Sequence, residues 1–297
     1  MKNLEQFAEA PQISGGYIRN NNAIAPEVIQ YLEDNSDFRQ YFLVKPTDGV
    51  LSKTYKVEKE DGMAVQVTGN AEVPRAEAIS KYFTVFLKRI ATGYAIDDDD
   101  RRINADDPSF ETRKMQYALK RMVKKQDYDM ANVLIAGAGS TTSGATGKLT
   151  VDLIKKGILA MIEAVKEAQV DNPICEPDTI FMNYAKFVEL QADESFQLVP
   201  EIYREVLLSN GLKGPVNTFS GQTGQSVAGL NIVIMSELDK DVIIIDSKRD
   251  ALWLVEDVGP RITKYRDDEH ISDIVDIRHD MQPVAVFPEY LHKITFD

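Results

Sequence analysis

The sequence has 297 residues, of which 43% are hydrophobic and 27% charged, a globular composition that excludes an intrinsically disordered chain. Its 34 basic and 47 acidic residues give a formal net charge of −13. Affinity for nucleic acid depends on Lys and Arg that neutralise phosphates, so this balance argues against tight DNA binding by the chain as a whole.

The single cysteine and the lack of long apolar runs limit the environment of the protein. Cys175 has no partner cysteine, so the sequence predicts no intrachain disulfide, no thiolate metal cluster and a reducing compartment. The amino-terminal Met1–Phe7 lacks the apolar core of a signal peptide. No apolar run approaches the roughly 20 residues that cross a bilayer. We therefore expect a soluble protein, made in the cytoplasm, with no membrane partner.

The amino-terminal region is polar and rich in turn-forming residues. Residues 1–23 show no hydrophobic periodicity, which predicts an arm that is ordered only against neighbours. Pro26 suits the first turn of a helix, and the apolar spacing after it predicts a short helix that ends near Asn35.

The next region, Lys45–Arg75, has the pattern of a long hairpin. Val50–Val57 is strand-like, Asp61-Gly62 is a turn signal, and Met63–Thr68 follows as a return strand. Few of these side chains are large and apolar, so the hairpin cannot cover a core of its own. Because an isolated two-stranded ribbon is marginally stable, we expect it to lie on a partner.

A long helix is the strongest pattern in the middle of the chain. Lys81–Ile96 is typical of one strand, and Asp107 stands as an N-cap before Pro108. Apolar residues then recur at three- and four-residue intervals through residue 136. Such a helix, 108–136, would be a rod of about 44 Å, longer than most globular helices. It predicts a structural spine.

The second half alternates helices and strands after a small-residue linker, Ser140–Gly147, which is the best candidate for a boundary. Helices are expected at Leu149–Val170, Tyr184–Leu190 and Ile202–Leu208, a buried strand at Thr179–Met182, a glycine-rich loop at Asn210–Gly224, and extended segments at Gly229–Glu237, Asp241–Asp246, Ile271–Arg278 and Val284–Thr295.

Two motifs invite a binding function, and each has a simpler interpretation. Asp97–Asp100 offers carboxylates to calcium or magnesium, but it lacks the spaced oxygens of an EF-hand loop, which favours a solvated acidic turn. The segment Gly137–Lys148 resembles a phosphate loop, but it follows a helix, and Lys148 is succeeded by Leu149 rather than Ser or Thr. A flexible linker is favoured there.

The candidate chemical groups also favour structural roles. His270, Asp273, Asp276, His279 and Asp280 could form a metal site, yet their spacing puts them on both faces of a strand. His292 has no nearby nucleophile in the sequence, and Cys175 is flanked by residues that would not lower its pKa. Lys120, Arg121, Lys124 and Lys125 form a basic patch, but Asp127 and Asp129 follow, which favours a surface of ion pairs over a DNA groove. We assign no catalytic, cofactor-binding or metal-binding residue and expect no enzymatic activity.

The order of these elements resembles the major capsid protein of tailed double-stranded DNA viruses, the Hong Kong 97-type capsid fold. The resemblance covers nearly the whole chain but rests on order rather than on one diagnostic peptide. Ile180–Leu190 looks like the strand-to-helix step of the family's axial domain, and Arg249–Tyr265 looks like its strand pair leading back out. It implies an α+β fold with an arm (1–27), an extended hairpin loop (45–80), a peripheral domain (28–44, 81–147 and 262–297) with spine helix 108–136, and an axial domain (148–261).

The resemblance also implies a function and a set of partners. The chain would self-assemble into hexamers and pentamers of an icosahedral shell in the host cytoplasm and become part of the virion. A separate scaffold, a portal and a possible decoration protein would join it, and packaged DNA would be contacted only weakly, since an acidic wall lets DNA slide. Expected assembly contacts are Lys53, Tyr55, Lys56, Lys59, Asp61, Gly62, Asn217 and Phe219. Deletion of Thr47–Asn70 is expected to give a soluble subunit that forms no shells.

The sequence departs from some relatives in two ways. Some fuse a scaffolding segment before the arm, whereas this sequence starts almost at the arm, so we expect a separate scaffold, none, or a mature form. Some also cross-link a hairpin lysine to an asparagine near the end of the peripheral domain. Lys53, Lys56 and Lys59 could be donors, but no asparagine follows Asn231, which predicts no such cross-link.

Three alternatives remain open from the sequence. An encapsulin, a bacterial compartment shell for cargo enzymes, shares the fold. A metal-dependent hydrolase could use Asp97–Asp100 or the His270–Asp280 stretch. A tail tube subunit is a third possibility, which the long spine helix disfavours.

Overall fold

The computed structural model describes residues 23–24, 26–59, 79–104, 106–107, 109–144, 147–168, 175–193, 222–257 and 259–296. Several expected features lie outside these residues: the arm up to residue 22, the turn at Asp61-Gly62 with the return strand Met63–Thr68, the helix Ile202–Leu208, and the glycine-rich loop up to residue 221.

The first of two six-stranded sheets is built around one long strand, β13 (Ser272–Ala285). Residues 272–278 lie between β12 (Arg261–Asp267) and β5 (Lys88–Asp97), while residues 281–285 pair with β11 (Leu252–Glu256). All these pairs are antiparallel. β1 (Ala23–Ile24) extends the sheet beside β12, and β2 (Leu43–Pro46) pairs in parallel with β11.

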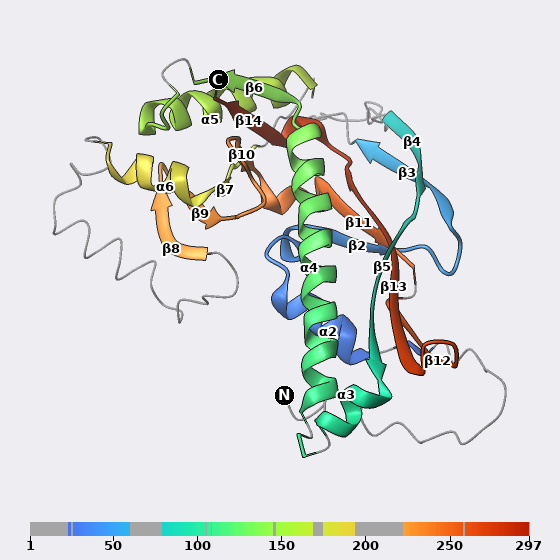
Figure 1. The fold of residues 1–297 in the computed structure, drawn as a ribbon. Helices are drawn as coiled ribbons and strands as arrows, with labels where there is room; N and C mark the ends of the chain where they lie inside the picture. The colour runs from blue at the N-terminus through green and yellow to red at the C-terminus, as the bar shows by residue number, and fades with distance from the viewer. Residues whose placement is uncertain are drawn as a thin grey trace.

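The spine helix α4 (Phe110–Ala136) crosses one face of this sheet and contacts β5 and β13 (Figure 1). Met115, Leu119, Met122, Met130 and Leu134 form its buried stripe, which confirms the periodicity seen in the sequence. The helix begins at residue 110 rather than 108 because Asp107 caps a turn before it: its carboxylate accepts from Ser109 N at 3.0 Å and Ser109 Oγ at 2.7 Å. The preceding α2 (Pro26–Asn35) is the predicted short helix.

The acidic run before the spine is helical and ion-paired, not a solvated turn. Asp98–Ile103 forms α3, with three aspartates in its first turn, where carboxylates interact favourably with the helix dipole. The Asp98 carboxylate accepts two bonds from Arg266 at 2.7 and 2.8 Å, and Asp100 accepts one from Lys114 at 2.7 Å. These bonds tie α3 to β12 and to the spine.

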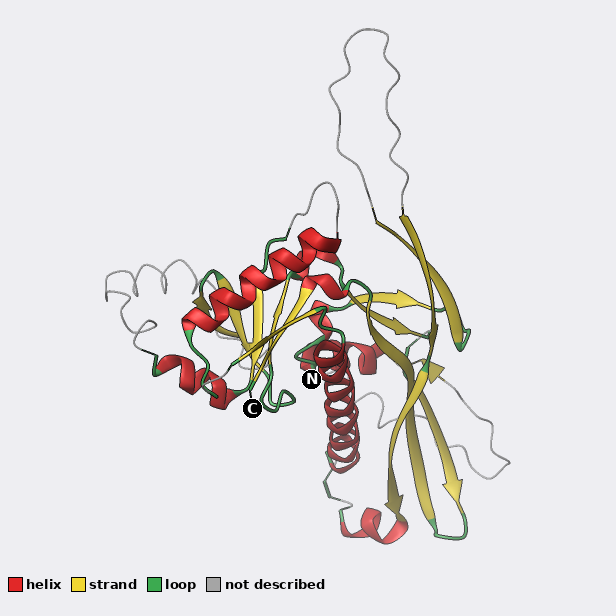
Figure 2. Cartoon of the chain, turned by 90° about the horizontal axis from the view of Figure 1, so that it is seen from above, coloured by secondary structure: helices red, strands yellow, loops and turns green. Residues whose placement is uncertain are grey.

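The second sheet has the order β6-β14-β10-β7-β9-β8 and lies beside the first sheet rather than face to face with it (Figures 1 and 2). Its strands are β6 (Ser140–Ser143), β14 (Leu291–Thr295), β10 (Val242–Ile245), β7 (Thr179–Met182), β9 (Leu230–Ile234) and β8 (Gln222–Val227). Helix α5 (Val151–Ala168) packs on β6 and β14, and α6 (Tyr184–Gln191) follows β7. The predicted strand Thr179–Met182 and the predicted helix after it are confirmed.

Two stretches of sequence behave differently from the expectation. The supposed linker at Ser140–Gly147 contains β6, a strand of small polar residues that pairs in parallel with β14. Its pairing partner is 152 residues away, at His292, so local composition could not show it.

The sheets also divide the chain differently from the expected domains. β11 belongs to the first sheet although it falls in 148–261, and β14 belongs to the second although it falls in 262–297. The division into peripheral and axial domains stays a prediction.

The expected single strand Lys81–Ile96 is two strands that belong to different sheets. β4 (Ile79–Phe86) pairs with β3 (Ser52–Lys59) in a two-stranded ribbon, and β5 begins at Lys88. The partner of β3 is therefore β4. The break occurs at Leu87, whose backbone N–H donates to Leu51 O at 2.9 Å, and no glycine or proline marks it in the sequence. Among the described residues, no helix is long and apolar enough to span a membrane.

Candidate assembly surfaces

One face of the β3–β4 ribbon is fixed to the rest of the chain by an aromatic cluster. Tyr55 and Phe83 face each other across the ribbon with ring centroids 5.9 Å apart. Both pack on Trp253 of β11, each at 5.6 Å between centroids, and Val57 and Val85 complete this buried group. The base of the ribbon is therefore a folded part of its own subunit.

The opposite face of the ribbon is exposed and carries large aromatic side chains. Residues alternate between faces along a strand, so Tyr82 and Phe86 point away from the Trp253 cluster. Tyr82 is 66% exposed and Phe86 68% exposed, with a bond of 2.8 Å between the hydroxyls of Thr54 and Thr84 between them. Val50 and Leu51, 51% and 63% exposed, precede the ribbon. This outer face is a candidate contact surface.

Some of the expected contact residues are engaged within their own chain, and others are exposed. Lys53 donates to the Asp48 carboxylate at 2.9 Å and to Pro46 O at 3.2 Å, so it is engaged within its own chain. Tyr55 lies in the Trp253 cluster, while Lys56 is exposed on the outer face. Lys59 is paired in β3, but its side chain lies outside the described residues, as do Asp61, Gly62, Asn217 and Phe219.

The sequence did not single out Tyr82 and Phe86. They were placed only within the expected strand Lys81–Ile96, with no prediction of which face is covered. The signal that could have found them is that β4 carries aromatic residues on both of its faces, whereas its own subunit covers only one face.

A second exposed apolar surface lies at the far end of the first sheet. Arg101 binds Asp273 at 2.7 Å and Glu111 at 3.2 Å, which joins α3 to β13 and to the spine. Around these neutralised charges, Ile103 is 80% exposed and Ile271 is 58% exposed. Ile271 O accepts from Asp98 N at 3.3 Å, so it borders the start of α3. These two exposed isoleucines make the tip a second candidate contact surface.

A buried polar network joins the spine to β11 and β13 of the first sheet. The Arg39 guanidinium donates to both oxygens of Glu256 at 3.0 Å, and His279 Nε2 lies 3.2 Å from Glu256 Oε2. The other ring nitrogen of His279 is 2.7 Å from the side-chain amide of Gln126 on the spine. Although burial opposes it, His279 and Arg39 hold the pKa of Glu256 below its ordinary value.

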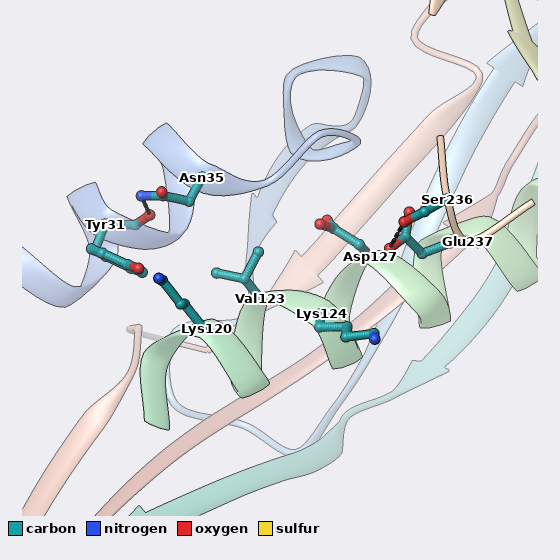
Figure 3. Close-up of a pocket in the computed structure, with 8 residues that line it drawn as sticks. All are labelled: Tyr31, Asn35, Lys120, Val123, Lys124, Asp127, Ser236 and Glu237. Carbon is teal, nitrogen blue, oxygen red and sulfur yellow. Dashed lines mark hydrogen bonds between the residues drawn. The ribbon is translucent and has the colours of Figure 1, made fainter. Parts of the chain in front are cut away.

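A pocket of about 290 Å³ lies between α2, the spine and the segment after β9 (Figure 3). At its base, Asp127 accepts a hydrogen bond of 2.5 Å from Ser36. Burial, together with the charges of Asp37 and Glu237, raises the pKa of Asp127 to about 7 against the effect of that bond. Burial and Glu237 likewise raise the pKa of Asp37 to about 6. This acidic junction is a structural contact between elements.

The candidate chemical groups are held in structural contacts. Within the described ranges, no three or more His, Cys, Asp or Glu side chains are grouped to hold a metal. His270 is exposed and bonded to Asp267 at 2.8 Å, whereas His279 is buried, so the two do not converge. His292 has a neighbour that sequence did not show: its Nδ1 is 2.7 Å from Ser140 Oγ. Burial lowers the pKa of His292 to about 4, so it is a poor base at neutral pH.

One family profile matches most of the chain, and solved structures share its fold. The profile of the family described as phage capsid protein matches residues 82–294. No curated protein matches the sequence. The capsid of Ralstonia phage GP4 is similar in structure, with a TM-score of 0.67 and 10% identity, covering 97% of each chain. The head structure of Helicobacter pylori bacteriophage KHP40 has a TM-score of 0.60 at 11% identity, covering 98% of this chain and 97% of that one.

A bacterial compartment protein is also similar. The SrpI encapsulin of Synechococcus elongatus has a TM-score of 0.58 at 10% identity, covering 99% of this chain and 94% of the other. The shared architecture is the Hong Kong 97-type capsid fold predicted from the order of elements. Because the matched profile spans well over half of the sequence, the chain belongs to the phage capsid protein family and is a structural capsid subunit.

Proposed function

We propose that the chain is the repeating subunit of an icosahedral shell that encloses double-stranded DNA, assembled from hexamers and pentamers in the host cytoplasm. It would act without catalysis. A separate scaffold, a portal and a possible decoration protein would take part in assembly, and DNA would be held weakly.

The outer face of the β3–β4 ribbon is the observation that carries this proposal. Its inner face is fixed on Trp253, while Tyr82 and Phe86 remain about two-thirds exposed in a single copy. Large aromatic side chains exposed on one face of a ribbon make that face a candidate site of protein contact. A second copy seated there would bury them, and a heterologous contact of this kind closes into a ring when the rotation between copies allows it. Lys56 would border the contact, and Lys59, Asp61, Gly62, Asn217 and Phe219 remain proposed contacts.

The test is assembly followed by analysis of the contents. The full chain, expressed alone and with candidate scaffolds encoded near its gene, is examined by negative-stain electron microscopy. Closed shells of uniform diameter support the proposal. A chain that stays monomeric under all these conditions contradicts it.

An encapsulin-type compartment is the second candidate, favoured by the similarity to the Synechococcus protein. Particle contents separate the two functions. Nuclease-protected DNA in particles from the natural host supports the viral shell, whereas a co-purifying enzyme without DNA supports the compartment. The metal-dependent hydrolase has no such support, because Asp98 and Asp100 are bound to Arg266 and Lys114.

A further inference from the structure

The exposed face of the spine helix is basic in an otherwise acidic protein. Tyr117, Arg121, Lys124 and Tyr128 recur at intervals of four, three and four residues, so they lie on one face of α4, with Lys120 beside them. All five side chains are exposed, including 58% of Tyr117 and 52% of Tyr128. From Tyr117 to Tyr128 the row extends about 17 Å along a straight rod.

The acidic residues that follow this row do not neutralise it. Asp127 is buried and bonded to Ser36, and Figure 3 shows the Lys124 side chain pointing away from its carboxylate. Asp129 pairs with Lys125 at 2.6 Å, so the expected surface of ion pairs holds for Lys125 alone.

The three remaining cations of this face have no ion-pair partner among the residues that the structure describes. Lys120, Arg121 and Lys124 make no ion pair with any residue in the described part of the chain. Lys120 and Lys124 also border the pocket that Asp127 and Glu237 line. The row nevertheless carries three cations without an ion pair among the described residues, in a chain whose net charge is −13.

We propose that this spine face, made of Tyr117, Lys120, Arg121, Lys124 and Tyr128, contacts the phosphate backbone of packaged double-stranded DNA. This inference rests on the proposed function, which puts such DNA inside the shell. Lysine and arginine bind phosphates independently of sequence and release condensed counterions, and tyrosine hydroxyls donate to phosphate oxygens. A straight row of cations on a rigid rod suits the regular phosphates of a duplex.

The number of phosphates that the three cations neutralise sets the strength of the DNA contact and its salt dependence. Three phosphates neutralised per subunit give a slope of about −2.7 for the logarithm of the affinity against the logarithm of the salt concentration. Such a contact is weak for one subunit and falls steeply with salt. Repeated over many copies it would hold DNA against the wall without fixing it.

The test is a salt titration of purified full-length protein with a short linear DNA duplex. The variant Lys120→Gln/Arg121→Gln/Lys124→Gln is compared with Lys88→Gln/Lys155→Gln/Lys156→Gln, which removes three exposed lysines elsewhere and changes the net charge equally. We expect the wild type and the control to bind at low salt with a slope of about −2.7. The spine variant should bind at least about tenfold more weakly, with a slope near zero.

Several outcomes would overturn the proposal. They are a wild type that does not bind at low salt, a spine variant that keeps the wild-type slope, and a control that loses affinity as much as the spine variant. If the spine variant fails to form shells while its DNA affinity is unchanged, the face contacts another copy instead. Shell formation is read separately from micrographs, so a wild type that forms shells but does not bind DNA refutes this inference and leaves the proposed function standing.

Discussion

Tyr55 of β3 and Trp253 of β11 meet edge to face, with ring centroids 5.6 Å apart and planes at 79°. The two residues are almost 200 positions apart in the sequence, and their contact fixes the angle at which the ribbon leaves the first sheet. The ribbon thus has a covered inner face and an exposed outer face, and these two faces give different predictions.

Trp253→Ala should destabilise the subunit by about 3–5 kcal/mol, because it removes a large buried ring and leaves a cavity under Tyr55 and Phe83. Urea unfolding measures the loss, and hydrogen exchange should show that amides of β3 and β4 lose more protection than those of α5. Trp253→Phe, which keeps an aromatic ring, is the milder control. Equal losses of protection in the ribbon and in α5 would show that the contact does not act locally.

Tyr82→Lys/Phe86→Lys should abolish shells while leaving the subunit folded, since both side chains are exposed in a single copy. The change introduces charge where we propose a second copy to bury apolar surface. Circular dichroism and thermal unfolding should match the wild type, and electron microscopy should show no closed particles. Tyr184→Lys, at another exposed aromatic residue, is the control and should still assemble. Normal shells from the double variant would remove the outer face from the assembly contacts.

This pair of substitutions replaces the deletion of Thr47–Asn70 as a test of the hairpin. That deletion would also remove Tyr55 and Val57 from the buried cluster around Trp253. Failure to form shells would then follow from a damaged fold as readily as from a lost contact.

The contribution of Asp127 to the stability of the subunit should fall as pH rises from about 4 to about 7. Buried Asp127 has its pKa raised to about 7, whereas an unfolded aspartate releases its proton near its ordinary value of 3.8. Between those values Asp127 is more protonated in the folded state than in the unfolded state, so its contribution to the free energy of unfolding decreases with pH, by a few kcal/mol at most. Asp127→Asn should flatten this dependence and be more stable than wild type at pH 8. Urea unfolding across the pH series tests it, with Asp129→Asn as the surface control; an unchanged slope in Asp127→Asn would exclude this carboxylate as the cause.

Particles should show no ladder of covalent multimers on a denaturing gel. A lysine–asparagine cross-link of the known geometry needs an asparagine near the end of the peripheral domain, and none follows Asn231. Lys53, one possible donor, is also engaged by Asp48 and Pro46 within its own chain. Boiled particles run in denaturant should give one band near the mass of 33.3 kDa. Bands at its multiples that resist boiling and reducing agent would contradict the prediction.

The sequence was most informative where a pattern is local. The spine helix, α2, α6 and the buried strand Thr179–Met182 follow from apolar periodicity and capping residues that lie next to one another. The family could be inferred from the order of such elements. The start of the spine was displaced by two residues, because Asp107 caps a turn instead of the helix itself.

What could not be predicted depends on contacts between distant residues. Nothing around Ser140 shows that it lies in a strand beside His292, and nothing in Lys81–Ile96 shows that its two halves join different sheets. The prediction of contact residues was the least accurate part. Lys53 and Tyr55 were chosen because they lie in the hairpin, but which face of a strand is covered is decided by Trp253, far along the chain.

The position of β14 has a consequence for biosynthesis. This strand lies between β6 and β10, which both emerge from the ribosome earlier, so the second sheet stays open until residue 295 has been translated. A nascent chain that stops before that point leaves two edges exposed and cannot offer a finished subunit to its neighbours.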